Sequence, residues 1–467
     1  MVFSSQLFLF YFLPLSLALY YATPQRLRPL VLTLLSYTFY GWANPLFLAL
    51  IFASTTIDYF CALTAARPGR YRRWALFASI AANLSLLGFF KYANFAAANY
   101  DALLQALGLP AWQLDLGLRI ALPLGISFYT FQSMSYTIDV YRGRVQPLRN
   151  FIDFACYISL FPQLVAGPIV RYVEIADQLL QRSHTLGKFA RGAALVSLGL
   201  GKKVLLANPC GKIADTAFNA GSIGPLDAWL GALAYAFQIY FDFSGYSDMA
   251  IGLGLMLGFV LPKNFDAPYR AESITQFWQR WHLSLSYWLR DYLYIPLGGN
   301  RKGAARTYLN LAVVMLLGGL WHGAAWNFLA WGGLHGALLG LERARGRHSL
   351  YAILPRPARV GCTFVILLFT WVFFRAADLP SALHYCASML ALTPIQEGAG
   401  LIGGLLYQPY YLATLAAAAL VVWAGVPAAD WTRHLSAAKV GLVLLVLWPA
   451  LAALLVQDYN PFIYFIF

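Results

Sequence analysis

The feature that most constrains this chain is a series of long apolar stretches that recur from one end to the other. The run from Tyr308 to Leu341, for example, contains no Asp, Glu, Lys or Arg. An α-helix needs about 20 mainly apolar residues to cross a bilayer, and backbone polar groups in lipid must be hydrogen-bonded within the protein. Because these stretches are continuous rather than alternating, they predict helices instead of a β-barrel. The sequence therefore predicts an all-α polytopic membrane protein.

The composition supports this class and excludes others. Only 11% of the 467 residues are charged and 60% are hydrophobic, whereas about 25% are charged in an ordinary soluble domain. The net charge of +14 is explained by Lys and Arg in short cytoplasmic loops, so we expect no nucleic-acid partner. Five scattered cysteines without a CxxC pair, and histidines without ligand spacing, predict neither a disulfide framework nor a metal site. No polar stretch is long enough for a second, soluble domain.

Several stretches predict particular helices. Residues 226–242 and 245–261 are predicted as two separate spans, and residues 308–321 and 324–341 as a hairpin with His322 near its turn. Within 151–168, two prolines and a glycine predict a broken helix, which either crosses the membrane or enters and leaves on one side.

The distribution of basic residues predicts the orientation. The segments 67–73, 263–306 and 342–359 are basic and are predicted to face the cytoplasm. Residues 1–21 are apolar but have no basic region ahead of the apolar core, which favours a retained first helix over a cleaved signal peptide.

The hairpin contains the first candidate functional residue, in the segment Leu320-Trp321-His322-Gly323-Ala324. An ionisable side chain at membrane depth is a functional-site hypothesis by default, and a neutral imidazole can act as a general base. The alternative is a structural histidine hydrogen-bonded between helices, and these residues alone do not separate the two interpretations. His335, further along the same run, fits the structural interpretation better.

A second candidate lies in the aromatic stretch 277–300, which is too polar to span a membrane. One interpretation is an amphipathic helix at the membrane interface, with arginines extending to the headgroups. The other is a re-entrant helix that lines a cavity, with His282 facing the same centre as His322.

A third stretch holds Asp242 and Asp248 between two predicted spans. Carboxylates there are costly unless paired or solvated, and helix capping or pairing with arginine is favoured over catalysis.

Taken together, several motifs resemble a known family. They are Leu160-Phe161-Pro162-Gln163-Leu164-Val165-Ala166-Gly167-Pro168-Ile169, the stretch 240–252, the run Arg280-Trp281-His282-Leu283-Ser284-Leu285-Ser286-Tyr287-Trp288-Leu289-Arg290-Asp291-Tyr292, and Trp321-His322-Gly323-Ala324. The chain resembles the membrane-bound O-acyltransferases, and within them the branch that acetylates bacterial exopolysaccharides such as alginate. The branch that transfers D-alanine to teichoic acids is similar over the same core.

The resemblance implies a fold and a function. The fold is a helical bundle with re-entrant or interfacial helices around a central tunnel, formed by a single domain, 1–467, with a catalytic core at about 120–345. The implied function is to pass acetyl groups from a cytoplasmic donor, acetyl-CoA, across the bacterial inner membrane for O-acetylation of an exopolysaccharide such as alginate. The implied partners are periplasmic acetyltransferase subunits of the same system, and no permanently bound cofactor is expected.

The resemblance also assigns two residues, to which the chemistry of acyl transfer adds further candidates. The catalytic histidine of the family falls on His322 and its second histidine on His282. Acyl transfer needs a base for the hydroxyl proton and donors for the developing oxyanion. Support and tunnel candidates are Asn327, Tyr240, Asp242, Trp321 and Ser284. Candidates to hold the phosphates of the donor are Arg280, Arg290, Arg301 and Lys302, for which orientation in the membrane is the alternative role.

Two alternatives to acetyl transfer remain. One is D-alanyl transfer to a teichoic acid-type polymer. The other, from a different class, is a transporter or flippase, which typically has two pseudo-symmetric halves; the hydropathy shows no such pairing.

Overall fold

The structure is a computed structural model of the chain and describes residues 1–114, 120–346 and 348–463. Within these ranges the protein is helical and contains no β-strand, which confirms the predicted all-α class. By its internal contacts the chain divides into two compact units: unit 1 consists of Met1 and Phe12–Arg182, and unit 2 of Val2–Tyr11 and Ser183–Phe467. Whether the two form the single domain expected from the sequence stays a prediction.

Unit 1 is built from short and medium helices, of which α3, α4 and α6 all pack against one another. Its helices are α1 Leu13–Ala22, α2 Arg28–Gly41, α3 Leu46–Ala65, α4 Tyr71–Leu87, α5 Ala93–Ala106, α6 Ile126–Tyr141, α7 Phe151–Ser159, α8 Phe161–Leu164 and α9 Tyr172–Leu180. Its short 3-10 or π turns are η2 Gln25–Leu27, η3 Gly88–Tyr92 and η4 Pro110–Trp112, whereas η1 Phe8–Phe12 belongs to unit 2 except for Phe12.

The predicted break within 151–168 is confirmed. Helix α7 ends at Ser159, Leu160 leaves the helical conformation with φ −47° and ψ 109°, and α8 resumes for one turn with Pro162 near its start. A side chain of α2 satisfies the buried backbone at this break, since the Ser36 hydroxyl accepts from the Phe161 N–H at 3.0 Å.

Unit 2 contains the longest helix and most of the residues singled out in the sequence. Its helices are α10 Leu186–Gly201, α11 Asn208–Phe218, α12 Pro225–Met256, α13 Ile274–Trp278, α14 Leu283–Leu289, α15 Gly303–His322, α16 Trp326–Ala344, α17 Arg356–Arg375, α18 Leu379–Met389, α19 Gly403–Leu406, α20 Pro409–Trp423, α21 Ala428–Trp431 and α22 Ala437–Val456. Its turns are η5 Lys202–Ala207, η6 Pro268–Arg270, η7 Arg290–Tyr294 and η8 Ala399–Ile402.

The prediction of two spans at 226–242 and 245–261 is wrong, because the first span and the second as far as Met256 belong to the continuous 32-residue helix α12. Gly245 does not interrupt this helix but allows α10 to approach it. A Cβ on Gly245 would lie 2.7 Å from the Gly199 carbonyl oxygen, and a Cβ on Gly199 would lie 2.5 Å from that of Gly245. Small residues that let two backbones approach are common where helices pack in membranes. Gly245 therefore marks a crossing of two helices. In the sequence, a glycine at such a crossing looks the same as a glycine that breaks a helix.

Asp242 and Asp248 therefore lie inside a helix, and the expectation that they cap helix ends is wrong. The expectation that they are paired is confirmed, although the partners are lysines rather than arginines. Lys203 Nζ lies 2.8 Å from Asp242 Oδ1, with both side chains almost fully buried, and Lys202 Nζ lies 2.6 Å from Asp248 Oδ2. Because a charge in a low-dielectric interior is costly unless it is paired, these two pairs allow α12 to carry carboxylates through the core of unit 2.

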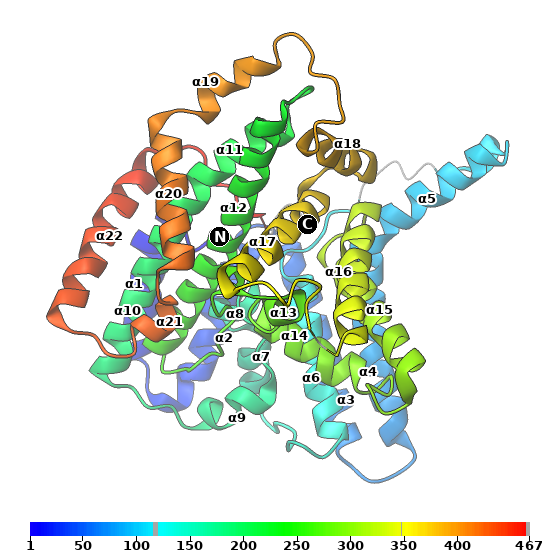
Figure 1. The fold of residues 1–467 in the computed structure, drawn as a ribbon. Coiled ribbons are helices and arrows are strands. Elements are labelled where there is room, and N and C mark those ends of the chain that lie inside the picture. Colours follow the sequence, from blue (N-terminus) through cyan, green and yellow to red (C-terminus); the bar gives the residue numbers. More distant parts are fainter. Residues whose placement is uncertain (115–119, 347, 464–467) are drawn as a thin grey trace. The chain divides into compact units, whose positions relative to one another are not determined.

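The predicted hairpin is confirmed. Helices α15 and α16 run side by side (Figure 1) and are joined by a three-residue turn, with His322 as the last residue of α15. Gly332 on α16 lies directly against the backbone of Met315 on α15. This close contact sets the distance between the two helices that carry much of the site.

The helices include enough long apolar ones for a multi-pass membrane protein. Five stretches of the described chain are long and apolar enough to cross a membrane, and a sixth is added if the bent pair Ala399–Leu406 and Pro409–Trp423 counts as one span. The five are Leu46–Ala65, Tyr71–Ala106, Gly303–His322, Arg356–Arg375 and Ala437–Val456. The predicted polytopic class is confirmed.

Candidate functional site

Two buried histidines meet in unit 2. His322 ends α15, His282 immediately precedes α14, and their ring centroids lie 6.3 Å apart. Both side chains are buried. The expectation that these two segments come together is confirmed, while the catalytic role of the two residues stays a prediction.

His282 is held in an unusual backbone conformation. Its φ of 45° and ψ of 55° lie in the left-handed region, which costs a non-glycine residue about 1–3 kcal/mol and persists only where the surroundings enforce it. Two backbone hydrogen bonds fix the turn: Leu283 N–H donates to the Asn264 carbonyl at 2.9 Å, and Ser286 N–H donates to the His282 carbonyl at 3.0 Å. The chain bends sharply here and delivers the imidazole into the interior.

The stretch 277–300 is consequently not one amphipathic interfacial helix. It is broken into the end of α13, the short helix α14 and the π turn η7, and Phe277, Trp281 and Leu285 are buried. Of the two interpretations of this stretch, the structure supports the segment that lines a cavity.

Aromatic rings surround the histidine pair. The His322 ring centroid lies 5.0 Å from that of Trp321, 5.3 Å from Trp331 and 5.2 Å from Phe374. The His282 ring packs edge-on against Phe243 at 4.7 Å. Such surroundings lower the local dielectric constant, so any hydrogen bond or developing charge between the two rings interacts more strongly than it would in water.

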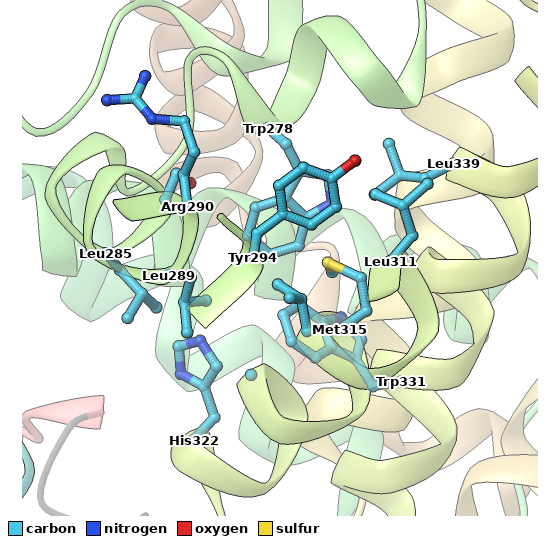
Figure 2. Close-up of a pocket in the computed structure, with 13 residues that line it drawn as sticks. Trp278, Leu285, Leu289, Arg290, Tyr294, Leu311, Met315, His322, Trp331 and Leu339 are labelled. Atoms are coloured by element: carbon cyan, nitrogen blue, oxygen red, sulfur yellow. The ribbon is translucent and has the colours of Figure 1, made fainter. Parts of the chain in front are cut away.

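An apolar cavity of about 210 Å³ opens beside His322 (Figure 2). It is lined by residues from α13, α14, η7, α15 and α16: Trp278, Leu285, Ser286, Leu289, Arg290, Tyr294, Leu311, Val314, Met315, Gly318, His322, Trp331 and Leu339. In Figure 2 the guanidinium of Arg290 and the hydroxyl of Tyr294 point away from His322. The imidazole of His322 thus lies at one part of the cavity, and the polar ends of Arg290 and Tyr294 lie away from it, with apolar side chains in between. The tunnel through the bundle stays a prediction.

Burial also controls the charge of His282. Desolvation lowers its pKa from 6.5 to about 3, because an imidazolium ion loses its hydration in the interior. His282 is therefore neutral at physiological pH, with one ring nitrogen carrying a proton and the other a lone pair.

The support candidates divide into two groups. Trp321 adjoins both histidines, 5.0 Å from His322 and 6.0 Å from His282 between ring centroids, and the Ser284 hydroxyl donates to Asn264 next to His282. Asn327 has a different task. Its Nδ2 donates to the carbonyls of Phe373 at 3.2 Å and Ala376 at 2.8 Å, so both amide N–H groups are used to hold the end of α17 and neither is left for an oxyanion.

Tyr240 and Asp242 are placed by α12. The Tyr240 ring packs against Tyr269 at 5.4 Å and Trp281 at 6.3 Å, which makes it part of the aromatic core. Asp242, besides its lysine partner, accepts from the Ile463 N–H at 2.8 Å, and Lys203 also donates to the Pro461 carbonyl. Asp242 thus anchors the C-terminal segment of the described chain to α12.

The four residues expected to bind the phosphates of the donor have different surroundings in the structure. Arg290 lines the cavity, pairs with Asp291 at 2.7 Å and stacks on Tyr287 at 5.0 Å. Arg280 donates to the Asp266 carbonyl at 3.2 Å. Arg301 and Lys302 are exposed and are not among the residues described as lining this cavity.

Three residues of the site were not predicted from the sequence. Asn264 contacts His282 and Ser284, Trp331 packs on His322, and Trp278 donates its indole N–H to His335 Nδ1 at 3.2 Å. Nothing in the sequence singles out Asn264, which lies 18 residues before His282. The Trp278 contact gives His335 the structural role favoured from the sequence.

Comparison with known proteins decides the family. The profile of the membrane-bound O-acyltransferase family matches residues 145–377. The probable alginate O-acetylase AlgI of Pseudomonas putida is 43% identical over the full length of both chains. This chain belongs to the membrane-bound O-acyltransferase family. It is thus an enzyme, an O-acyltransferase, and the transporter alternative does not hold.

More distant relatives within this family differ in what their names say they acylate. The peptidoglycan O-acetyltransferase of Helicobacter pylori is 39% identical over 85% of this chain and 81% of its own. The teichoic acid D-alanyltransferase of Streptococcus thermophilus is 31% identical over 47% of this chain and 57% of its own. The family profile includes both histidines and the cavity-lining residues.

Proposed function

We propose that this O-acyltransferase takes acetyl groups from acetyl-CoA on the cytoplasmic side and passes them across the bacterial inner membrane for O-acetylation of an exopolysaccharide such as alginate. The observation that carries the proposal is the buried pair His322 and His282 beside an apolar cavity. The full-length similarity to a probable alginate O-acetylase supports acetyl as the group and a polysaccharide as its destination.

The chemistry follows from an imidazole that lines a mainly apolar cavity. A hydroxyl of the acceptor attacks the thioester carbonyl carbon, its O–H proton passes to His322, and a new C–O bond forms. The tetrahedral intermediate then expels coenzyme A as the C–S bond breaks, and the proton held by His322 goes to the departing sulfur. General-base catalysis of this kind typically contributes about 10²–10⁴-fold in rate, and fixed orientation of the two reactants adds to it.

The character of the cavity favours acetyl over D-alanyl transfer. A D-alanyl group carries an ammonium charge, which needs a carboxylate or other acceptors when it is removed from water. The described cavity residues include no Asp or Glu, and the one charged side chain among them, Arg290, has the same sign as the ammonium. A methyl group, in contrast, packs well against leucine and methionine side chains.

The remaining parts of the proposal concern the donor and the partners. Arg290 at the cavity is suited to a phosphate of coenzyme A, since guanidinium groups form strong charge-assisted hydrogen bonds with phosphates. We infer that periplasmic acetyltransferase subunits receive the acetyl group and that no permanently bound cofactor takes part.

The test compares two histidines in one chain. A Pseudomonas putida strain without its own probable alginate O-acetylase is complemented with the wild type, His322→Ala or His384→Ala, and the O-acetyl content of its alginate is measured. His384 is exposed on α18 and serves as the matched control. We expect acetylation with the wild type and His384→Ala and none with His322→Ala, at equal protein levels in the membrane.

Two results would contradict the proposal. Full acetylation by His322→Ala removes this residue from the mechanism. Purified wild-type protein that discharges a D-alanyl-loaded carrier protein to the free carrier thiol, but releases no coenzyme A from acetyl-CoA labelled in the acetyl group, would replace acetyl by D-alanyl transfer.

A further inference from the structure

Asn264 connects three residues of the turn that carries His282. Its side-chain oxygen Oδ1 lies 2.9 Å from Ser284 Oγ, 3.3 Å from the Ser284 backbone nitrogen and 3.2 Å from His282 Nδ1. Its Nδ2 lies 3.2 Å from Ser247 Oγ on α12, and its backbone carbonyl accepts from Leu283. The side chain is almost completely buried, at 1% exposure. Asn264 therefore ties the left-handed turn to the longest helix of unit 2.

These contacts determine which way the amide faces. A backbone N–H can only donate, so the atom of Asn264 that meets the Ser284 N–H has to be the carbonyl oxygen. The amide nitrogen then faces the Ser247 hydroxyl, which can accept. An inverted amide would place two donors against each other at Ser284.

The orientation of the amide decides the tautomer of His282. Because Nδ1 faces a carbonyl oxygen, Nδ1 has to carry the proton and donate it. In a neutral imidazole the other nitrogen, Nε2, is then unprotonated and can only accept. Nε2 is buried and has no hydrogen-bond partner among the described residues, while the ring lies next to His322 and Trp321.

We propose that Asn264 is a positioning residue that holds His282 as the Nδ1–H tautomer, so that His282 offers a lone pair at Nε2 to the reaction and acts there as a hydrogen-bond acceptor. The tautomer follows from the contacts alone, whereas its use in acetyl transfer rests on the proposed function. The tautomer excludes neutral His282 as a donor to the oxyanion. In this tautomer, Nε2 of His282 can accept a hydrogen bond from the hydroxyl of the acyl acceptor or from the N–H of His322. A hydrogen bond from His322 keeps the lone pair of the His322 ring correctly oriented.

The tautomer can be measured without any assay of activity. The ¹⁵N shifts of the two ring nitrogens distinguish the Nδ1–H form, the Nε2–H form and the imidazolium ion in protein labelled with ¹⁵N-histidine. The difference between the spectra of the wild type and His282→Gln identifies the resonances of His282. We expect the Nδ1–H form at neutral pH in the wild type, and either an Nε2–H form or an imidazolium ion there would overturn the proposal even if His322 proves to be catalytic.

Variants of Asn264 test its role in the reaction. Asn264→Ala removes the acceptor, and we expect kcat for acetyl transfer to fall by about tenfold or more with little change in KM for acetyl-CoA. Asn264→Asp keeps an acceptor at Nδ1 and adds a negative charge, which favours the imidazolium form. We therefore expect Asn264→Asp to keep the Nδ1–H signal and to raise the pKa at which His282 titrates in the NMR spectrum.

The control is Asn310→Ala. Asn310 is buried to the same degree and donates to the Gly299 carbonyl at 2.9 Å, so its loss also removes a buried amide from unit 2. A purely structural role for Asn264 predicts that both alanine variants reduce the amount of folded protein while leaving the His282 tautomer unchanged. An unchanged tautomer in folded Asn264→Ala would refute the positioning role.

Discussion

Replacing Gly332 by alanine is expected to push apart α15 and α16, the two helices of the hairpin that carries His322. A Cβ built on Gly332 lies closer than 3.0 Å to the Met315 carbonyl oxygen, a distance that Cβ atoms essentially never show. Ordinary contact begins near 3.4 Å, and the obstructing atom is backbone, which cannot rotate away. Helices α15 and α16 must then move apart by at least several tenths of an ångström.

The expected change in the free energy of unfolding follows from a comparison with the next residue, Gly333. A Cβ on Gly333 meets only the Leu316 side chain, at 3.7 Å, so Gly333→Ala introduces no overlap. Both substitutions gain about 0.8–1.0 kcal/mol of helix propensity, while overpacking typically costs about 1–3 kcal/mol. The free energy of unfolding of Gly332→Ala should therefore lie about 1–3 kcal/mol below that of Gly333→Ala.

Function should be affected more than stability. His322 ends α15, Trp331 directly precedes Gly332 on α16, and both line the cavity. A displacement of about 1 Å between reacting groups can cost about 10²-fold in rate. We expect Gly332→Ala to lose most acetyl-transfer activity and Gly333→Ala to keep it.

The assay measures unfolding of each purified variant in detergent by denaturant titration, followed through tryptophan fluorescence, together with acetyl transfer from labelled acetyl-CoA. If the two variants have the same free energy of unfolding and the same activity, the close contact between α15 and α16 is absent and the reasoning is refuted.

Three further perturbations have defined outcomes. Asp242→Asn leaves a buried lysine unpaired and should cost about 3–5 kcal/mol, whereas Asp266→Asn at a half-exposed pair should cost at most about 1 kcal/mol; denaturant titration compares them. The pKa of His282 is about 3 in the folded protein and 6.5 in the unfolded chain, so the unfolded chain binds the proton first. The free energy of unfolding should therefore fall as the pH drops from 6.5 towards 3, and it should fall less steeply in His282→Gln. Arg290→Ala should raise KM for acetyl-CoA and Arg301→Ala should not; equal effects in steady-state kinetics would exclude a specific role for Arg290.

The apolar stretches alone were enough to predict the class of the protein. In lipid, backbone polar groups have to be satisfied within each helix, so long apolar stretches are enough to predict an all-α membrane protein. Local chemistry also predicted the hairpin at 308–341 and the break within 151–168, where proline removes a backbone donor. His282 and His322 stood out because imidazoles are uncommon in such surroundings.

The roles of residues that lie far apart in the sequence became clear from the fold and not before. Gly245 is a packing contact rather than a helix break because α10 lies against it, and Asp242 is paired within a helix because Lys203 reaches it from η5. The tautomer of His282 depends on Asn264, 18 residues earlier in the chain. These roles come from hydrogen bonds and contacts between separate elements, whose partners cannot be identified from the local sequence around either residue.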